Sequence, residues 1–372
     1  MRGCAEFRHS FVVALLPGAV FVACFAGALG AAERETAAVD GWLVYPSQTE
    51  PKILEWAERH ADLVSLERQR TFEGRTAYAI TVTGATGDRA AKRKLLFSQP
   101  HAHEPAATAG MMNFLAKLLD GVDLSGKAAD LDRKTILDEY LLSFIPDGNP
   151  DGRARAPLPW WDGTKYSNDA FLKLAFGREE DGSRAKRVGR WSSRVHQPPV
   201  IGFAYERINE HEYVEPNRDR ESTFFKLLLR LRDRHQYDIH LDLHQTEFAR
   251  SGRDSAVFLP FMQEKLPEAI RAENARLGRA IIGAWKQSGA NPVQEPTFAG
   301  YGEEQNQWFR ACWSDLYRTT PHLMVEVQNN NTRTSPKRQR ELIEISIVAA
   351  IEHAAARRRA PSPLLDAQPN RP

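Results

Sequence analysis

Residues 94–119, KLLFSQPHAHEPAATAGMMNFLAKLL, predict one strand followed directly by one helix. The apolar run 94–98 is typical of a short buried strand. Pro105 begins the helix, where the missing N–H of proline costs little because the first turn has no acceptor for it. The polar loop 99–104 joins the two and carries two histidines and one glutamate. A strand that leads through such a loop into a helix is the building unit of an α/β sheet.

The same alternation of apolar strands and amphipathic helices continues along the chain. We expect strands at 75–83, 94–98, 140–145, 239–243 and 323–327, and helices at 53–63, 105–119, 221–235, 267–287 and 336–358. This order predicts one α/β domain with a twisted, mixed and mainly parallel sheet that is flanked by helices. Residues 153–197 are rich in Arg, Gly and Trp, and we expect them to form a long irregular insertion over one edge of the domain.

The two ends of the chain differ from this core in composition. Residues 1–31 combine a basic start, an apolar run and small residues, which is the pattern of a secretory signal peptide. An uncleaved anchor helix is the alternative, although Pro17 interrupts the run, and Cys24 leaves a lipoprotein open. We expect a folded domain over 38–358 and a flexible proline-rich tail over 361–372. The expected protein is therefore secreted or periplasmic, with no stable membrane anchor after signal removal.

Composition limits the classes of function that remain. The 372 residues include 50 Lys and Arg against 48 Asp and Glu, so no excess of charge indicates binding to nucleic acid. Three cysteines without a CxxC pair cannot hold zinc or build a disulfide framework, and only Cys312 lies outside the predicted signal peptide. Any metal site must therefore use histidines and carboxylates.

The loop after the strand 94–98 carries the first candidate site. His101 and Glu104 are three residues apart across the turn, so both can converge on one point beyond the carboxyl end of the strand, where α/β sheets bind ligands. Imidazole with carboxylate suits zinc. Taken alone, the pattern also fits a glutamate that neutralises a helix N-terminus beside surface histidines.

The strand 239–243 carries the second candidate site. Alternation of side chains puts His240, Asp242 and His244 on one face of an otherwise apolar strand. Polar groups in such a place are costly to bury without a purpose. His244, at the end of the strand, is the natural third ligand, and the other two would support the site or be satisfied within the core.

Two further clusters contain charged groups in unusual places. Glu326 lies inside the apolar strand 323–327, and burial would raise the pKa of its carboxyl group and make it a candidate general base or acid. A buried ion pair with an arginine is the alternative. Asn217 and Arg218 are adjacent on a loop and can bind a carboxylate, although a surface loop explains them equally well in isolation.

Taken in chain order, these clusters resemble the zinc carboxypeptidases of the carboxypeptidase A type, from about residue 42 to about residue 353. Each motif is short and common, but their joint occurrence in this order is specific. The matching positions are Gly74-Arg75, His101 and Glu104, Asn149-Pro150-Asp151-Gly152, Glu215 with Asn217-Arg218, His244, and Glu326.

The resemblance implies a hydrolytic metal site over the predicted domain 38–358. His101, Glu104 and His244 would hold one Zn²⁺ per chain, which polarises the scissile carbonyl and acidifies a water. Glu326 would accept the proton of this water and deliver it to the leaving amine.

The resemblance also implies residues that bind the substrate, a peptide or amide with a free C-terminal carboxylate. Asn217 and Arg218 would bind this carboxylate, and Glu215 stands where the family has an acidic residue that orients a zinc histidine. Tyr301, on a loop flanked by glycines, is the best candidate for the mobile tyrosine of the family. A further arginine should stabilise the oxyanion. The candidates for it are Arg190, Arg194 and Arg207.

Some positions depart from the family pattern. Gln245-Thr246-Glu247 follows His244 where Ser-Tyr is common, and the string resembles the related acylamino-acid deacylases.

The sequence leaves three hypotheses for the function. The first is an exported zinc metallocarboxypeptidase. The second is a zinc amidase or deacylase that acts on cell-wall peptides or acylated amino acids. The third is a zinc-binding recognition domain without activity, against which the retained Glu326 argues.

Overall fold

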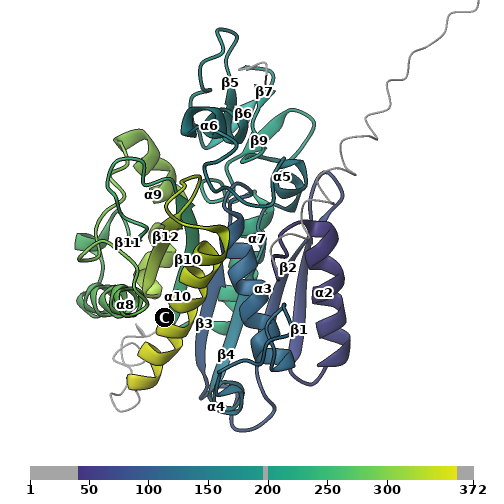
Figure 1. Ribbon diagram of the computed structural model, residues 1–372, viewed down its shortest axis with the longest axis vertical. Coiled ribbons are helices and arrows are strands. Elements are labelled where there is room, and N and C mark those ends of the chain that lie inside the picture. The colour runs from purple at the N-terminus through teal and green to yellow at the C-terminus, as the bar shows by residue number, and fades with distance from the viewer. Residues whose placement is uncertain (1–40, 196–199, 358–372) are drawn as a thin grey trace, which may run out of the picture.

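The computed structural model describes residues 41–195 and 200–357 (Figure 1). The predicted signal peptide at 1–31 and the predicted tail at 361–372 lie outside the described residues, as do the outermost residues of the predicted domain 38–358. Within the described ranges, no helix has the length and apolar character needed to span a membrane.

A seven-stranded sheet forms the centre of the fold, in the order β1-β2-β4-β3-β10-β12-β11. The strands β4, β3, β10 and β12 are parallel neighbours, whereas β1, β2 and β11 pair antiparallel at the two edges. The α/β class and the mixed sheet are therefore confirmed, and the parallel strands are the central ones. The strands are β1 (Val64–Arg70), β2 (Thr76–Val82), β3 (Arg93–Ser98), β4 (Tyr140–Ile145), β10 (Ile239–Thr246), β11 (Ser255–Phe258) and β12 (His322–Gln328).

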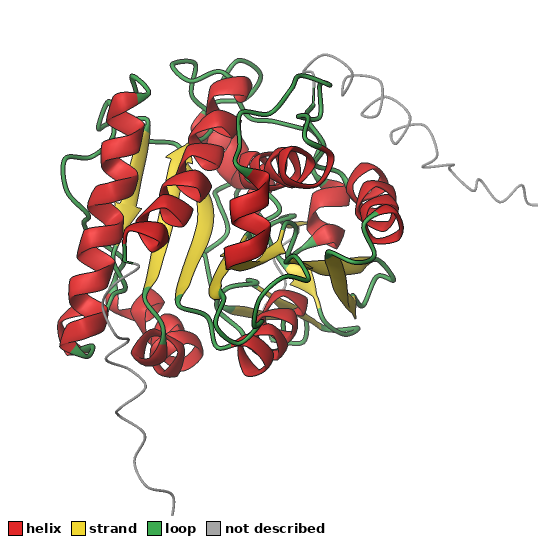
Figure 2. Cartoon of the chain, turned by 90° about the horizontal axis from the view of Figure 1, so that it is seen from below, coloured by secondary structure: helices red, strands yellow, loops and turns green. Residues whose placement is uncertain are grey.

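Helices cover both faces of this sheet (Figure 2). Because side chains alternate along a strand, β3 directs Leu95 and Phe97 into one apolar core and Leu96 into the other. This explains why the central strands are continuous apolar runs in the sequence. The first face packs against α2 (Pro46–Arg59), α3 (Pro105–Asp120), α8 (Glu268–Gln287) and α10 (Pro336–Ala356), and the second against α7 (Thr223–His235) and α9 (Glu303–Thr319).

The predicted strands and helices are present, with some shifted ends. Helix α2 begins at Pro46 and ends at Arg59, earlier at both ends than the predicted 53–63. Strand β10 continues to Thr246, because its pairing with β12 extends to Gln328, so His244 lies within the strand rather than after it. The sequence did not predict β1, β11, α9 or the short α4 (Arg133–Glu139). Charged and polar residues dominate β1 and α9, which hides their apolar faces.

Residues 150–195 and 200–214, here called the cap segment, lie over the carboxyl ends of the central strands (Figure 1). The segment has an apolar core of its own that includes Trp161, Phe171 and Tyr205, so the insertion predicted over 153–197 is present at one edge of the domain, but the prediction that it is irregular is wrong. Its apolar residues are far apart in the sequence and show no local period. Its elements are α5 (Pro150–Arg155), α6 (Asn168–Phe176), β5 (Gly177–Arg178), β6 (Arg190–Ser192), β7 (Val200–Ile201), β8 (Glu206–Arg207) and β9 (Glu212–Val214).

The turn 149–152, Asn-Pro-Asp-Gly, joins β4 to the cap segment. The asparagine side chain accepts a hydrogen bond from the N–H of Gly152 at 2.9 Å and so caps α5. The fully buried Asp151 binds the Arg75 guanidinium at 3.1 Å. A Cβ atom on Gly152 would lie 2.2 Å from the carbonyl oxygen of Phe203. These family-like motifs therefore position the cap segment and make no direct contact with the metal-binding side chains.

Candidate active site

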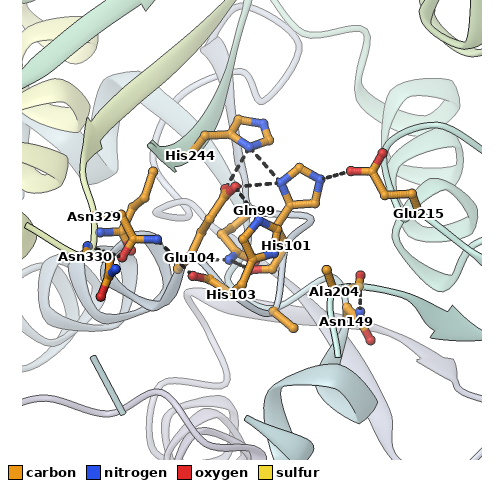
Figure 3. A network of polar contacts seen from close by, with 12 residues as sticks. Gln99, His101, His103, Glu104, Asn149, Ala204, Glu215, His244, Asn329 and Asn330 are labelled. Carbon is orange, nitrogen blue, oxygen red and sulfur yellow. Dashed lines mark hydrogen bonds and ion pairs between the residues drawn. The ribbon is translucent and has the colours of Figure 1, made fainter. Parts of the chain in front are cut away.

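The predicted zinc ligands meet at the carboxyl edge of the central strands (Figure 3). His101 and Glu104 come from the loop between β3 and α3, and His244 comes from β10. The Glu104 carboxylate lies between the two imidazoles, with Oε1 3.0 Å from His101 Nδ1 and Oε2 2.9 Å from His244 Nδ1. The two Nδ1 atoms are 3.1 Å apart. All of these side chains are buried.

This spacing of donor atoms fits one zinc ion. Tetrahedral zinc with ligand bonds of about 2.0–2.1 Å keeps its donors about 3.3–3.4 Å apart, so small outward shifts are sufficient. Two nitrogens and one carboxylate are also the donor set of catalytic zinc sites, which keep one position open.

Carboxylates hold the far side of both imidazoles. His101 Nε2 lies 2.7 Å from Glu215 Oε1, and His244 Nε2 lies 2.9 Å from Asp242 Oδ2. The hydrogen bond to Asp242 places a proton on His244 Nε2 and directs Nδ1 to the metal position, which is how neighbouring carboxylates orient metal-binding histidines, and the Glu215 carboxylate lies on the corresponding side of His101. The predicted orienting role of Glu215 therefore has a geometric basis.

Burial and charge set the protonation of the cluster. Burial lowers the pKa of His101 to about 4, so this imidazole is neutral at neutral pH, as a metal ligand must be. Burial alone would raise the pKa of Glu104, but the surrounding histidines outweigh it and hold the pKa well below its usual value. Burial likewise opposes charge on His244, yet Asp242 and Glu104 together raise its pKa. Metal binding must therefore displace a proton from His244.

His103 is a neighbour of this cluster that the sequence analysis did not single out. Its Nε2 lies 3.2 Å from Glu104 Oε1, and His101, His103 and Glu104 form a group that could hold a metal ion. Its ring packs against Phe176 of the cap segment at a centroid distance of 5.0 Å. In the sequence, only the position of His103 in the loop 99–104 indicated that it could lie near the metal site.

Glu326 lies beside His244, with which it pairs in register between β12 and β10. The side chain is 5% exposed, and its Oε2 has no hydrogen-bond partner within the described residues. No ion pair of Glu326 occurs in that part of the chain either, so the alternative of an arginine pair is not met. Burial, together with the carboxylates of Glu104 and Glu247, raises the pKa of Glu326. The result is a buried carboxyl group with a free oxygen next to the metal ligands.

Asn217 and Arg218 are buried at the site and do not form a surface loop. Arg218 forms an ion pair with Glu215, but its guanidinium nitrogens make no hydrogen bond among the described residues. Its guanidinium carbon lies 5.7 Å from the ring centroid of Tyr301 and 5.0 Å from that of Phe309. Burial lowers the pKa of Arg218 to about 9, so it remains a cation at neutral pH. A buried cation whose Nε and Nη2 face no partner among the described residues favours an anionic ligand.

Tyr301, predicted from its glycine-flanked loop to be the mobile tyrosine, lies next to Arg218. Its ring stacks on Phe309 at a centroid distance of 5.3 Å. Burial, with a smaller contribution from the Glu326 carboxyl group, raises the pKa of its phenol. Gly300, at φ 70°, precedes it, so the backbone of this loop uses a conformation that favours glycine.

None of the arginines considered for the oxyanion lies among these residues. Arg190 forms a bidentate pair with Asp219 at 2.8 and 3.0 Å, and Arg207 donates to the carbonyls of Asn209 and Glu210. Arg194 is exposed. These candidates were wrong because the choice among them depended on the fold of the cap segment.

Arg187, which the sequence analysis did not consider, lies beside Glu215 at the site. Its Nη2 lies 2.8 Å from Glu215 Oε1, and its guanidinium carbon lies 4.5 Å from the ring centroid of Phe176. Its Nε is buried without a hydrogen-bond partner among the described residues. Its positive charge contributes to the lowered pKa of His101 and partly offsets the raised pKa of Glu326. The cap segment thus contributes a cation to the site.

The departure at Gln245 has a structural explanation. Its Oε1 accepts a hydrogen bond from the N–H of Ala106 at 2.7 Å, and its Nε2 donates to the carbonyl of Gln328 at 3.1 Å. Gln245 therefore ties the first turn of α3 to β10 and β12. This residue does not distinguish a deacylase from a peptidase.

Comparison with known proteins agrees with this site. The family model for zinc carboxypeptidases matches residues 52–244, more than half of the chain, including all three predicted ligands. The chain belongs to the zinc carboxypeptidase family. It is thus a zinc metallopeptidase, and its family supports metallocarboxypeptidase activity.

Solved structures show the same fold at low identity. A metallo-carboxypeptidase from Burkholderia cenocepacia is 16% identical, with a TM-score of 0.52 over 82% of this chain and 68% of that chain. Carboxypeptidase A from Helicoverpa armigera is 14% identical, with a TM-score of 0.53 over 88% of this chain and 79% of that chain. No curated protein matches the sequence.

Proposed function

We propose that this protein is an exported carboxypeptidase that removes single residues from the free carboxyl end of peptides. The observation that carries the proposal is the buried guanidinium of Arg218, whose Nε and Nη2 have no hydrogen-bond partner among the described residues, next to the Glu215 carboxylate that also contacts His101. A terminal carboxylate matches this cation in charge and in its capacity for paired hydrogen bonds, whereas an internal peptide bond does not.

His101, Glu104 and His244 would hold Zn²⁺, which supplies a Lewis acid for the scissile carbonyl. Glu326 takes a proton from the attacking water and later delivers it to the leaving amine. Arg187, which pairs with Glu215 at the site, stabilises the negative charge that develops on the carbonyl oxygen.

The remaining side chains position the substrate. Asn217 and Arg218 bind its terminal carboxylate, and Asn217 has a buried Oδ1 without a partner within the described ranges. Tyr301, whose ring centroid lies 5.7 Å from the Arg218 guanidinium carbon, contacts the terminal residue. Glu215 orients His101 and also pairs with Arg187 and Arg218, so it links the metal ligands to both cations.

Two peptides that differ only at the carboxyl end test this proposal. The peptide with a free carboxylate should lose its last residue, and the amidated peptide should be hydrolysed at least about 30-fold more slowly, since an unpaired buried charge costs several kcal/mol. Mass spectrometry of the products measures both rates. Arg218→Met should remove the difference between the two peptides by slowing only the first.

The amidase or deacylase hypothesis predicts another outcome of the same experiment. If the blocked substrate were hydrolysed as fast as the free one, Arg218 would not bind a terminal carboxylate. A screen of acylated amino acids and cell-wall peptides would then identify the bond that is broken. No contact in the site favours this second function.

Arg187 and Arg190 form a matched pair for testing the oxyanion role. Arg187→Met should lower kcat by roughly 100- to 1,000-fold, the usual loss when one donor to an oxyanion is removed. Arg190→Met removes the same charge from a surface pair and should change kcat less than about 2-fold. Zinc content is measured alongside both variants. Equal kcat values for the two variants would contradict the assignment.

Export is the part of the proposal that depends on residues 1–31 alone. The basic, apolar and small-residue regions of this segment support a cleaved signal peptide and a product without a stable membrane anchor. N-terminal sequencing of the protein from the medium or periplasm tests it. A mature chain that begins near residues 29–33 is the expected result, and full-length protein in the membrane fraction would contradict it.

A further inference from the structure

A cavity of about 240 Å³ lies beside Arg218. Tyr301 and Phe309, the two rings that flank the Arg218 guanidinium, also line this cavity. Met324 lines it as well, two residues before Glu326 on the same face of β12. A peptide whose carboxylate is bound by Arg218 therefore has the cavity available for the side chain of its last residue.

The lining of the cavity is largely apolar and aromatic. Phe258, Phe261 and Phe298 contribute to it in addition to the rings named above. An engineered apolar cavity of about 150 Å³ is sufficient to bind benzene, so this space accepts one aromatic ring with room for a substituent. No acidic or basic side chain other than a histidine lines it.

His322, the first residue of β12, is that histidine. Its Nδ1 lies 3.1 Å from His240 Nδ1, and its backbone N–H donates to Asn274 Oδ1 at 2.9 Å. Nothing in the described part of the chain bonds to its Nε2. Burial lowers the pKa of His322 to about 3 and also lowers the pKa of His240, so both rings are neutral and each carries one proton.

A chain of buried hydrogen bonds decides which nitrogen of His322 carries this proton. Ser98 Oγ donates its single proton to Asp242 Oδ1 at 2.6 Å. His240 Nε2, 2.8 Å from the same Oγ, must therefore be the donor to Ser98. A neutral His240 then has an unprotonated Nδ1, which can only accept. It follows that His322 donates from Nδ1, and that its Nε2 is an acceptor.

We propose that His322 determines specificity by presenting Nε2 as a hydrogen-bond acceptor to the cavity, and that the protein prefers peptides ending in tyrosine over those ending in phenylalanine. The phenol O–H of tyrosine is a donor at the far end of a ring that fits the apolar walls. The inference rests on the proposed function, because it assumes that Arg218 holds the terminal carboxylate. The other polar lining residues are Tyr301, Tyr317 and Asn306, and the Asn306 amide already donates to the Tyr301 carbonyl.

Peptides that differ only in the last residue test the preference on the zinc-loaded wild-type protein. The last residue is tyrosine, phenylalanine or 4-fluorophenylalanine, which is close to tyrosine in size but cannot donate. We expect kcat/KM for tyrosine to exceed that for the other two by roughly 2- to 10-fold, the usual net effect of one hydrogen bond. Equal values for tyrosine and phenylalanine would overturn the inference and leave the proposed function intact.

The His322→Phe variant assigns the preference to this side chain. It removes the acceptor and keeps an aromatic ring, so the ratio of tyrosine to phenylalanine should fall to about one or below while phenylalanine peptides are still cleaved. A ratio that stays at the wild-type value would assign the acceptor to another group, such as Asn306, and overturn the proposal for His322.

A nitrogen NMR measurement on the histidine-labelled wild-type protein needs neither turnover nor a stable variant. We expect His322 as the tautomer with a protonated Nδ1 and an unprotonated Nε2. A protonated Nε2 would overturn the inference directly. If no peptide is shortened at all, the proposed function fails instead, and the tautomer still decides whether the cavity holds an acceptor.

Discussion

Replacing Glu326 by glutamine is expected to lower kcat by roughly 100- to 10,000-fold, the usual contribution of a general base, while zinc stays bound. The physical reason is that an amide cannot take a proton from water, although it fills the same buried space beside His244. Hydrolysis of a peptide with a free C-terminus and elemental analysis of the same sample measure the two quantities.

Glu247→Gln is the matched control for this variant. Glu247 is also a carboxyl group near the site, and burial raises its pKa to about 7. It affects Glu326 only through charge, so its replacement should change kcat by less than about 10-fold, the equivalent of about 1.4 kcal/mol. If Glu326→Gln kept the wild-type rate, the residue would not be the general base. If neither form cleaved any substrate, an inactive zinc-binding domain would have to be considered again.

His244→Ala is expected to weaken zinc binding by more than about 100-fold and to abolish hydrolysis. Loss of a group that merely supports a ligand already costs about 10- to 100-fold in metal affinity, and loss of the ligand itself costs more. Titration with a competing chelator measures the affinity. Chelation of the wild-type protein should abolish activity in the same way, and added zinc should restore it.

His103→Ala separates the ligands from their neighbour. His103 contacts the same Glu104 carboxylate, but it stands outside the ligand set that the family pattern implies. The variant should therefore keep about one zinc per chain. If it lost zinc as completely as His244→Ala, His103 would belong to the metal site and His244 would need another role.

The sequence by itself determined the fold class and selected the three candidate ligands that the fold brings together. Apolar runs such as 94–98 and 140–145 identify the central strands, because these strands are buried on both faces and need apolar residues at every position. His101, Glu104 and His244 could be selected because they follow or end such strands, and parallel strands bring their carboxyl ends to one edge. Glu326 stood out because a charged residue inside an apolar strand is rare.

The tertiary structure decided which groups of the cap segment and of α9 reach this edge. Arg187 was missed, and Arg190, Arg194 and Arg207 were considered in its place, because β5 pairs with β7 and β6 with β9 across distant parts of the cap segment, and these pairings leave no local period. The cavity beside Arg218 is likewise built from β11, β12, α9 and the loop before α9. The acceptor on His322 depends on a chain of contacts between three strands. Local sequence patterns record the burial of a segment, whereas the direction of a side chain from a loop is fixed only when distant segments pack together.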